Sequence, residues 1–324
     1  MLTIRTAWSM ARSWHPPLAW FGAAMLLLTP LAALGVLVDD RMLGGAPIWL
    51  KPVKFSASFV LYSFTTAWLV SRLRGRRRLA SVTATVIAAA SAIEMVVIVG
   101  QAARGRQSHF NNTTPLDGAL FSVMGATIAV LWLANLVLVV LLLRERSLDR
   151  PLATSLCLGL GVALVGMAIG FLMIVPTPAQ IAAQDRGEVT FDGAHSVGVP
   201  DGGPGLPITG WSTTGGDLRV SHFVGLHAVQ AMPLLVAVLA RWAPRFDLAT
   251  RVRLIRVVGI GYLGLVLLLT WQALRGQPLL APDLLTLVAL GVLVAGTGFG
   301  LRAATGRRSA PARPEVPAPV GSAG

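Results

Sequence analysis

Eight long runs of apolar residues dominate this chain, and most of them hold no charged side chain. Each has about 20 residues, the length that a helix needs to cross the hydrocarbon core of a bilayer. Only 13% of the 324 residues are charged, about half the share found in soluble domains. The sequence therefore excludes a soluble globular enzyme and predicts an all-α, polytopic integral membrane bundle. The predicted spans are residues 17–38, 53–71, 80–102, 118–143, 152–175, 221–240, 254–274 and 284–302.

Basic residues are concentrated on one side of this predicted bundle. With eight alternating spans, that side holds 19 of the 27 basic residues and four of the 14 acidic ones. Basic residues beside spans stay in the cytoplasm, so both termini are predicted to be cytoplasmic, in the cell membrane. Residues 18–38 form a longer uncharged run than a secretory signal uses, which indicates an uncleaved first span. Residues 309–324, rich in Pro, Ala and Gly, are predicted to be a disordered cytoplasmic tail.

The expected partners follow from charge and cysteine content. A net charge of +13 does not indicate nucleic acid, because the arginines flank spans and do not gather on one folded face. They predict contacts with membrane lipids, and a small hydrophobic substrate is the other expected partner. The single cysteine, Cys157, lies in an apolar run, which excludes a disulfide framework, a CxxC redox pair and a Cys-based zinc site.

A short motif occurs twice at equivalent places. Residues 101–105 read QAARG and residues 272–276 read QALRG, and each is followed by a loop with a Pro and an Asp. The match predicts two tandem four-helix repeats, residues 1–150 and 151–308, and parallel repeats place a shared site at their interface. The second copy has Leu265 at the position of Glu94, while His222 aligns with Lys54. One asymmetric, composite site is therefore expected.

Two acidic residues are the candidates for catalysis, Glu94 and Asp217. Glu94 lies inside the third span, on the same helix face as Ser91 and Gln101. An ionisable group at that depth normally faces the bundle interior or a water-filled cavity. The alternative for Glu94 is a structural hydrogen bond to a neighbouring helix.

Four of the five histidines are expected at the outer side, and they are the candidate ligands of a zinc ion or a haem. His222 and His227 are five residues apart, whereas two ligands on one helix are normally three or four apart. His222 can join His227 only if it precedes the helix. The alternative is that each imidazole makes a structural hydrogen bond. The candidate ligands are His109, His195, His222 and His227.

Polar residues at the outer ends of spans are the candidates for binding a cofactor or substrate. The only two lysines of the chain, Lys51 and Lys54, lie in one turn before the second span. A compact ammonium there can contact phosphate or carboxylate, or both lysines can extend to lipid headgroups. The candidate binding residues are Lys54, Gln101, Arg104, Gln230 and Gln272.

The one long connection, residues 176–220, is rich in glycine. A loop of this length is usually functional or disordered, and two interpretations stay open, an ordered lid over the outer end of the bundle or a disordered segment. The segment RGRQSHFNNTTPLDG, after the third span, is unusually polar for a membrane connector.

These features favour a membrane-embedded, metal- or haem-dependent enzyme acting on a lipid-like or quinone-like substrate. The alternative is an ion-coupled transporter or permease that uses Glu94, Lys54, Gln101 and Gln272, and a third is a sensor or scaffold. Two four-span halves with outer histidines are similar in outline to haem A synthase. That family has a histidine pair in each half and an external cysteine pair, which are missing here, so the sequence assigns no family.

Overall fold

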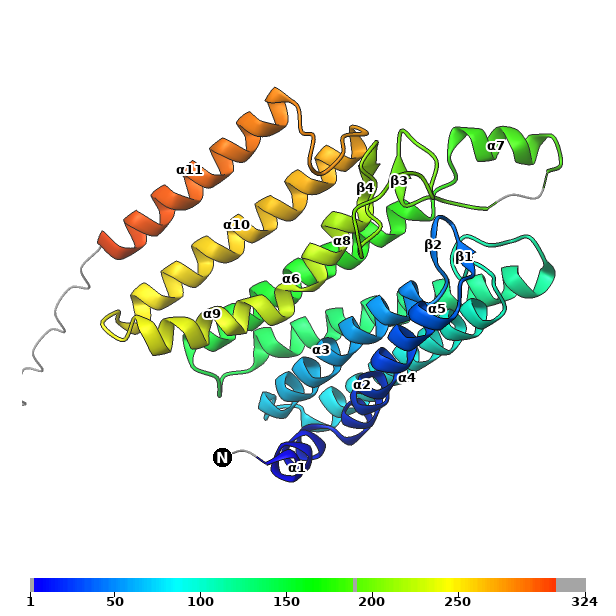
Figure 1. The fold of residues 1–324 in the computed structure, drawn as a ribbon. Helices are drawn as coiled ribbons and strands as arrows, with labels where there is room; N and C mark the ends of the chain where they lie inside the picture. Colours follow the sequence, from blue (N-terminus) through cyan, green and yellow to red (C-terminus); the bar gives the residue numbers. More distant parts are fainter. Residues whose placement is uncertain (1–2, 189–190, 307–324) are drawn as a thin grey trace, which may run out of the picture.

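The computed structural model describes residues 3–188 and 191–306, and it confirms the predicted all-α membrane bundle. Seven of its helices are long and apolar enough to cross a membrane, and a bent pair of shorter helices brings the number of spans to eight. Figure 1 shows these helices running side by side. The predicted tail, residues 309–324, lies outside the described residues.

The first half of the bundle holds four continuous spans. Local signals define their ends: the His15 ring accepts the Leu18 amide at the start of the first span, and Thr114 caps the fourth, with Pro115 as its first residue. Both arrangements satisfy amides that a helix leaves free at its start. The four spans are α2 (Pro16–Val38), α3 (Leu50–Arg72), α4 (Arg77–Ala103) and α5 (Pro115–Arg144).

The second half differs because its second span is broken. Helices α8 and α9 meet at His227 with a bend of 45°, where the sequence predicts one continuous run. The Tyr262 hydroxyl donates to the Val224 carbonyl beside the break, at 2.7 Å, which is one way a bent helix satisfies its backbone. The helices of this half are α6 (Arg150–Met173), α8 (Leu218–Leu226), α9 (Ala228–Trp242), α10 (Leu248–Leu274) and α11 (Leu284–Gly306).

Smaller elements cover the two ends of the bundle. Figure 1 shows both β-hairpins and α7 at one end, and α1 with the last turn of α11 toward the other. The described part of the loop 176–220 forms α7 and one hairpin, and it therefore has a defined structure on either side of residues 189–190. These elements are α1 (Ile4–Trp14), β1 (Met42–Leu43) paired with β2 (Ala46–Pro47), α7 (Pro178–Asp185), and β3 (Ser196–Val197) paired with β4 (Gly216–Asp217).

The core joins the two halves toward the arginine-rich end. A cluster of buried aliphatic side chains connects α3, α4 and α5 with α6, and the Trp132 indole donates to the Leu164 carbonyl at 3.1 Å. Nearer the other end, Gly166 of α6 and Gly225 of α8 touch backbone to backbone. Small residues such as these let two membrane helices approach closely.

The two QAxRG segments fold alike. Each ends its helix at a glycine with positive φ, 68° at Gly105 and 72° at Gly276. In each, the Gln side chain donates to a carbonyl six residues later and the Arg pairs with an Asp of the next span. The equivalent pairs are Gln101–Gln107 with Gln272–Pro278, and Arg104–Asp117 with Arg275–Asp283. The match is local, and the tandem repeat as a whole stays a prediction.

Candidate functional site

A lysine and a histidine meet at the outer end of the first half. Lys51, in the first turn of α3, donates from Nζ to Nδ1 of His109 in the α4–α5 loop, at 3.0 Å. An ammonium has no lone pair, so His109 must accept at Nδ1 and carry its proton on Nε2. The Ser108 hydroxyl lies 3.1 Å from the same nitrogen. His109 therefore presents an N–H group, not a lone pair, at Nε2.

Two further imidazoles come to this place from the second half. His195, in the loop before β3, donates from Nδ1 to Asp201 at 2.7 Å, and His222 of α8 donates from Nδ1 to the Gly166 carbonyl at 2.7 Å. Both neutral rings then carry an acceptor lone pair on Nε2. His195 and His222 both lie within electrostatic range of His109, so the structure brings three of the four predicted histidines together.

Aromatic rings fill the space between these polar groups. Phe55 of α3 lies with its ring centroid 6.2 Å from that of His109 and 6.2 Å from that of Phe223 on α8, and the Lys51 ammonium lies 5.6 Å from the Phe55 ring. A cation above an aromatic face is attracted by the ring electrons. The two halves therefore meet at this site through ring contacts.

Phe110 holds an unusual backbone conformation beside the histidines. Its φ is 62°, in the left-handed region that bulky residues rarely adopt. The ring of Phe110 packs 4.8 Å from that of His195 and 6.0 Å from that of His109, and its carbonyl accepts the Asp192 amide at 2.8 Å. Such a conformation costs about 1–3 kcal/mol and persists where its surroundings enforce it, often at functional sites.

Glu94 lies deeper in the bundle, below Lys51. It is 2% exposed, and it accepts a short hydrogen bond from the Thr127 hydroxyl of α5. Glu94 is within electrostatic range of Lys51, so the carboxyl and the ammonium influence each other. The sequence prediction that Glu94 faces the interior of the bundle agrees with this position.

The loop between α6 and α8 covers the site and is fastened to it. Lys54 donates to the Thr209 carbonyl at 2.8 Å, and Arg219 donates to the Gly210 carbonyl at 2.7 Å. Asn111, in the α4–α5 loop, forms a β-bridge with Phe191. The described parts of this loop therefore have a defined structure and contact both halves.

Burial keeps the loop histidines neutral. Surrounding protein atoms, and after them the charge of Lys51, hold the pKa of His109 well below its usual range. Burial also lowers the pKa of His195, although its bond to Asp201 acts in the opposite direction. For Asp201, burial raises the pKa, but the hydrogen bond from His195 and the nearby backbone amides outweigh it and the pKa falls. At pH 7 these imidazoles are therefore available as neutral donors or acceptors.

Several predicted binding residues serve the fold. Asp117 is 0% exposed and accepts from Gln101 at 2.9 Å and from Arg104 at 3.0 Å. Gln272 donates to the Pro278 carbonyl. These groups close the ends of α4 and α10, where carbonyls and loop backbone need partners.

Three other predicted residues lie at the ends of α8 and α9. Asp217, predicted as catalytic, caps α8 and binds Arg219 at 2.6 Å and the Ser212 amide at 2.8 Å, which leaves its carboxylate committed to structure. Gln230 of α9 has a buried side-chain oxygen without a hydrogen-bond partner among the described residues. His227 forms the break between α8 and α9.

Replacing Asp117 with asparagine is expected to lower the free energy of unfolding by about 2–3 kcal/mol, because the amide carries no charge to pair with Arg104 and has no second oxygen to accept from the Thr114 hydroxyl. The thermal unfolding of purified protein measures this loss. Asp283→Asn is the matched control: its ion pair with Arg275 is similar, but its side chain is 42% exposed, so a loss below about 1 kcal/mol is expected. Equal losses would show that burial of the first pair contributes nothing.

The predicted metal site is not supported. In the part of the chain that the structure describes, no group of three or more His, Cys, Asp or Glu side chains could hold a metal ion. The physical reason lies in the hydrogen bonds: His109 uses its Nδ1 lone pair for Lys51 and presents Nε2–H. His227, the fourth predicted ligand, lies at the helix break.

Sequence reasoning singled out Lys51 beside Lys54, because the chain has only two lysines and both lie in one turn, but it missed several other residues of this site. Thr127 and Asp201 bond directly to predicted residues, and Phe55, Phe110 and Phe223 pack between the rings. The aromatic residues carry no such signal, because single phenylalanines are common in membrane helices.

The chain was compared with known protein families, curated proteins and solved structures, and none of them matches it.

Proposed function

We propose that this membrane protein binds a lipid-like or quinone-like molecule at its outer end and exchanges protons with its headgroup, as an acid–base enzyme does. One observation carries this proposal: Lys51, His109, His195 and His222 come from both halves to one place, the histidine site, beneath a loop. A headgroup there would meet two kinds of hydrogen-bonding group. Lys51 and Nε2 of His109 donate, while Nε2 of His195 and of His222 accept.

The charges favour a headgroup with oxygen atoms. Lys51, Lys54 and Arg219 are within electrostatic range of one another, together with the carboxyl groups of Glu94, Asp201 and Asp217. Ammonium and guanidinium groups bind phosphate, carboxylate and carbonyl oxygens. The phenylalanine rings around them suit an apolar body.

Each polar residue has a role in this proposal. Lys51 holds the oxygen, His109 donates to it, and His195 or His222 takes a proton from a hydroxyl of the substrate. Glu94, bonded to Thr127 and influenced by Lys51, supplies or receives a proton from inside the bundle. A positioned acid or base near the operating pH contributes about 10²–10⁴-fold to a reaction rate.

Binding of two probes, dodecyl phosphate and decylubiquinone, tests the proposal. With the protein in lipid nanodiscs, isothermal titration calorimetry is expected to detect one of them, and Lys51→Met is expected to weaken its binding at least about tenfold, the loss of one hydrogen bond from a charged group. His227→Gln is the matched control, since His195 and His222, and not His227, act electrostatically on His109. Binding that Lys51→Met leaves unchanged, or that neither probe shows, would contradict the proposal.

The second candidate is an ion-coupled carrier, and the broken span favours it. Transporters often place a site where a helix is interrupted, and α8 and α9 meet at His227. The Tyr62 hydroxyl also donates a hydrogen bond to the Asn135 side-chain oxygen at 3.0 Å, closer to the arginine-rich end. Uptake of a solute driven by a pH gradient and abolished by Glu94→Gln would favour the carrier over the enzyme.

We also propose a cellular location for the chain and its origin by duplication of a four-span unit. The distribution of arginines supports the cell membrane with both termini in the cytoplasm. The matching QAxRG geometry supports a duplicated four-span unit, with copies in residues 1–150 and 151–308. In this arrangement the histidine site lies between the two copies at the extracytoplasmic side.

A further inference from the structure

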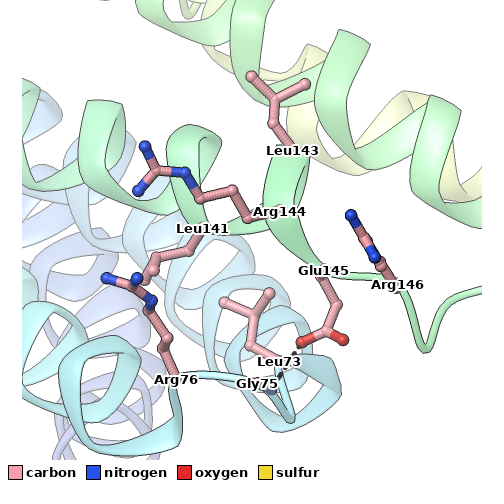
Figure 2. Close-up of a pocket in the computed structure, with 8 residues that line it drawn as sticks. All are labelled: Leu73, Gly75, Arg76, Leu141, Leu143, Arg144, Glu145 and Arg146. Atoms are coloured by element: carbon pink, nitrogen blue, oxygen red, sulfur yellow. Dashed lines mark hydrogen bonds between the residues drawn. The ribbon is translucent and has the colours of Figure 1, made fainter.

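A pocket lies at the opposite, arginine-rich end of the bundle. Its volume is about 440 Å³, and it lies between the α3–α4 turn and the end of α5. Figure 2 shows Arg76 and Arg144 on one side of Glu145, and Arg146 on the other. Leu73, Leu141 and Leu143 supply its apolar wall.

The three guanidinium groups of this pocket are exposed and have no partner within residues 3–188 and 191–306. Arg76, Arg144 and Arg146 make no side-chain hydrogen bond or ion pair to any described residue, unlike Arg104 and Arg219 at the other end. Arginine side chains that hold no partner keep all of their donors available. The pocket is therefore cationic.

Glu145 does not neutralise these arginines through direct pairing. Its carboxylate accepts the amides of Arg74 at 2.7 Å, Gly75 at 2.9 Å and Ser147 at 3.0 Å. These bonds, that of Gly75 first, lower the pKa of Glu145 to about 2. With three cations and one anion, the pocket keeps a charge of +2.

The start of α4 adds to this positive field. Arg76 is the N-cap of α4, and no side chain caps the helix there. The free amides at a helix start attract anions. The helix start and the arginine side chains therefore favour the same kind of ligand.

We propose that this pocket binds the phosphate group of an anionic lipid from the leaflet at the arginine-rich end. A guanidinium group can bind a phosphate through two parallel N–H···O hydrogen bonds. Leu143 is 68% exposed on the last turn of α5, next to Arg144, so acyl carbons can continue from the headgroup along that helix. This pocket is separate from the histidine site and does not depend on its function.

Native mass spectrometry of the full-length protein tests the proposal. The protein is reconstituted with phosphatidylcholine containing phosphatidylglycerol, and the number of retained lipids is counted. The double variant Arg144→Gln, Arg146→Gln is expected to weaken retention of phosphatidylglycerol about tenfold or more, since it removes two charged hydrogen-bond donors of the pocket. Glu145 is kept, so the turn that it fastens stays intact.

Two further arms separate the alternatives. The control variant Arg241→Gln, Arg256→Gln removes two exposed arginines outside the pocket, and its lipid retention is expected to stay within about twofold of the original. Inorganic phosphate that displaces phosphatidylglycerol from the original protein, but not from the Arg144 and Arg146 variant, would support a phosphate-binding pocket. It would also indicate that a soluble phosphate can be the ligand. Equal retention in both double variants would overturn the proposal.

Discussion

Gly225→Val is expected to destabilise the protein by about 3 kcal/mol or more, at least as much as the loss of the buried Asp117 carboxylate. A Cβ atom at Gly225 would lie 2.6 Å from the Gly166 Cα, closer than carbon atoms approach without movement. Overpacking usually costs about 1–3 kcal/mol, and backbone cannot move aside as a side chain can. Helices α6 and α8 would separate, and the hydrogen bond of His222 to Gly166 would break with them.

Thermal unfolding of the purified variant measures this effect. Gly161→Val is the matched control, because Gly161 lies on the same helix as Gly166 and a Cβ there meets nothing within 4 Å. A change within about 0.5 kcal/mol is expected for it. If the two variants unfold at the same temperature, the backbone contact does not hold the two helices together.

Lys51→Met is expected to have opposite effects on stability and on function. The ammonium is taken out of water beside Lys54 and Arg219, and Glu94 and Asp201 offset these like charges only in part, so its removal ends the desolvation cost of a charge in a partly buried place. Replacing a buried charge with an apolar side chain of similar size is often stabilising by about 1–4 kcal/mol. A higher unfolding temperature, together with the loss of probe binding, would indicate that the lysine is kept for its function.

The control for this change is Arg186→Met. Arg186 is a cation on the same side of the bundle, with a side chain that is 59% exposed and paired with Glu188. Its replacement is expected to change stability by less than about 0.5 kcal/mol and to leave probe binding intact. A fall in stability for Lys51→Met would mean that Lys51 serves the fold, as Asp117 does.

The spans could be predicted because a long apolar run has few alternatives to a membrane helix. The break at His227 could not, since residues 221–240 read as one continuous apolar run; beside the break, Gly225 packs against Gly166, which is 59 residues away in the sequence. A search for long apolar runs also does not detect helix α1 or the hairpins.

The site was predicted only in part, and the reason is chemical. A polar residue near the end of a membrane helix can bind a ligand or complete the backbone, and the sequence alone does not distinguish these roles. Gln101 and Gln272 complete helix ends, whereas His109 and His195 meet across the two halves. Asp217 belongs with the first kind, as an N-cap.

The most direct test of the shared site uses the two lysines of this chain. A protein labelled with ¹⁵N at lysine Nζ gives two side-chain signals in its NMR spectrum, from Lys51 and Lys54. His109→Gln is expected to shift the Lys51 signal strongly, because it replaces the ring nitrogen that accepts from Lys51 at 3.0 Å. Asp201→Asn, in the second half and within electrostatic range of Lys51, is expected to shift the same signal less. His227→Gln is expected to leave both signals in place. A Lys51 signal that Asp201→Asn leaves unchanged, or that responds to His227→Gln alone, would contradict a site shared by the two halves.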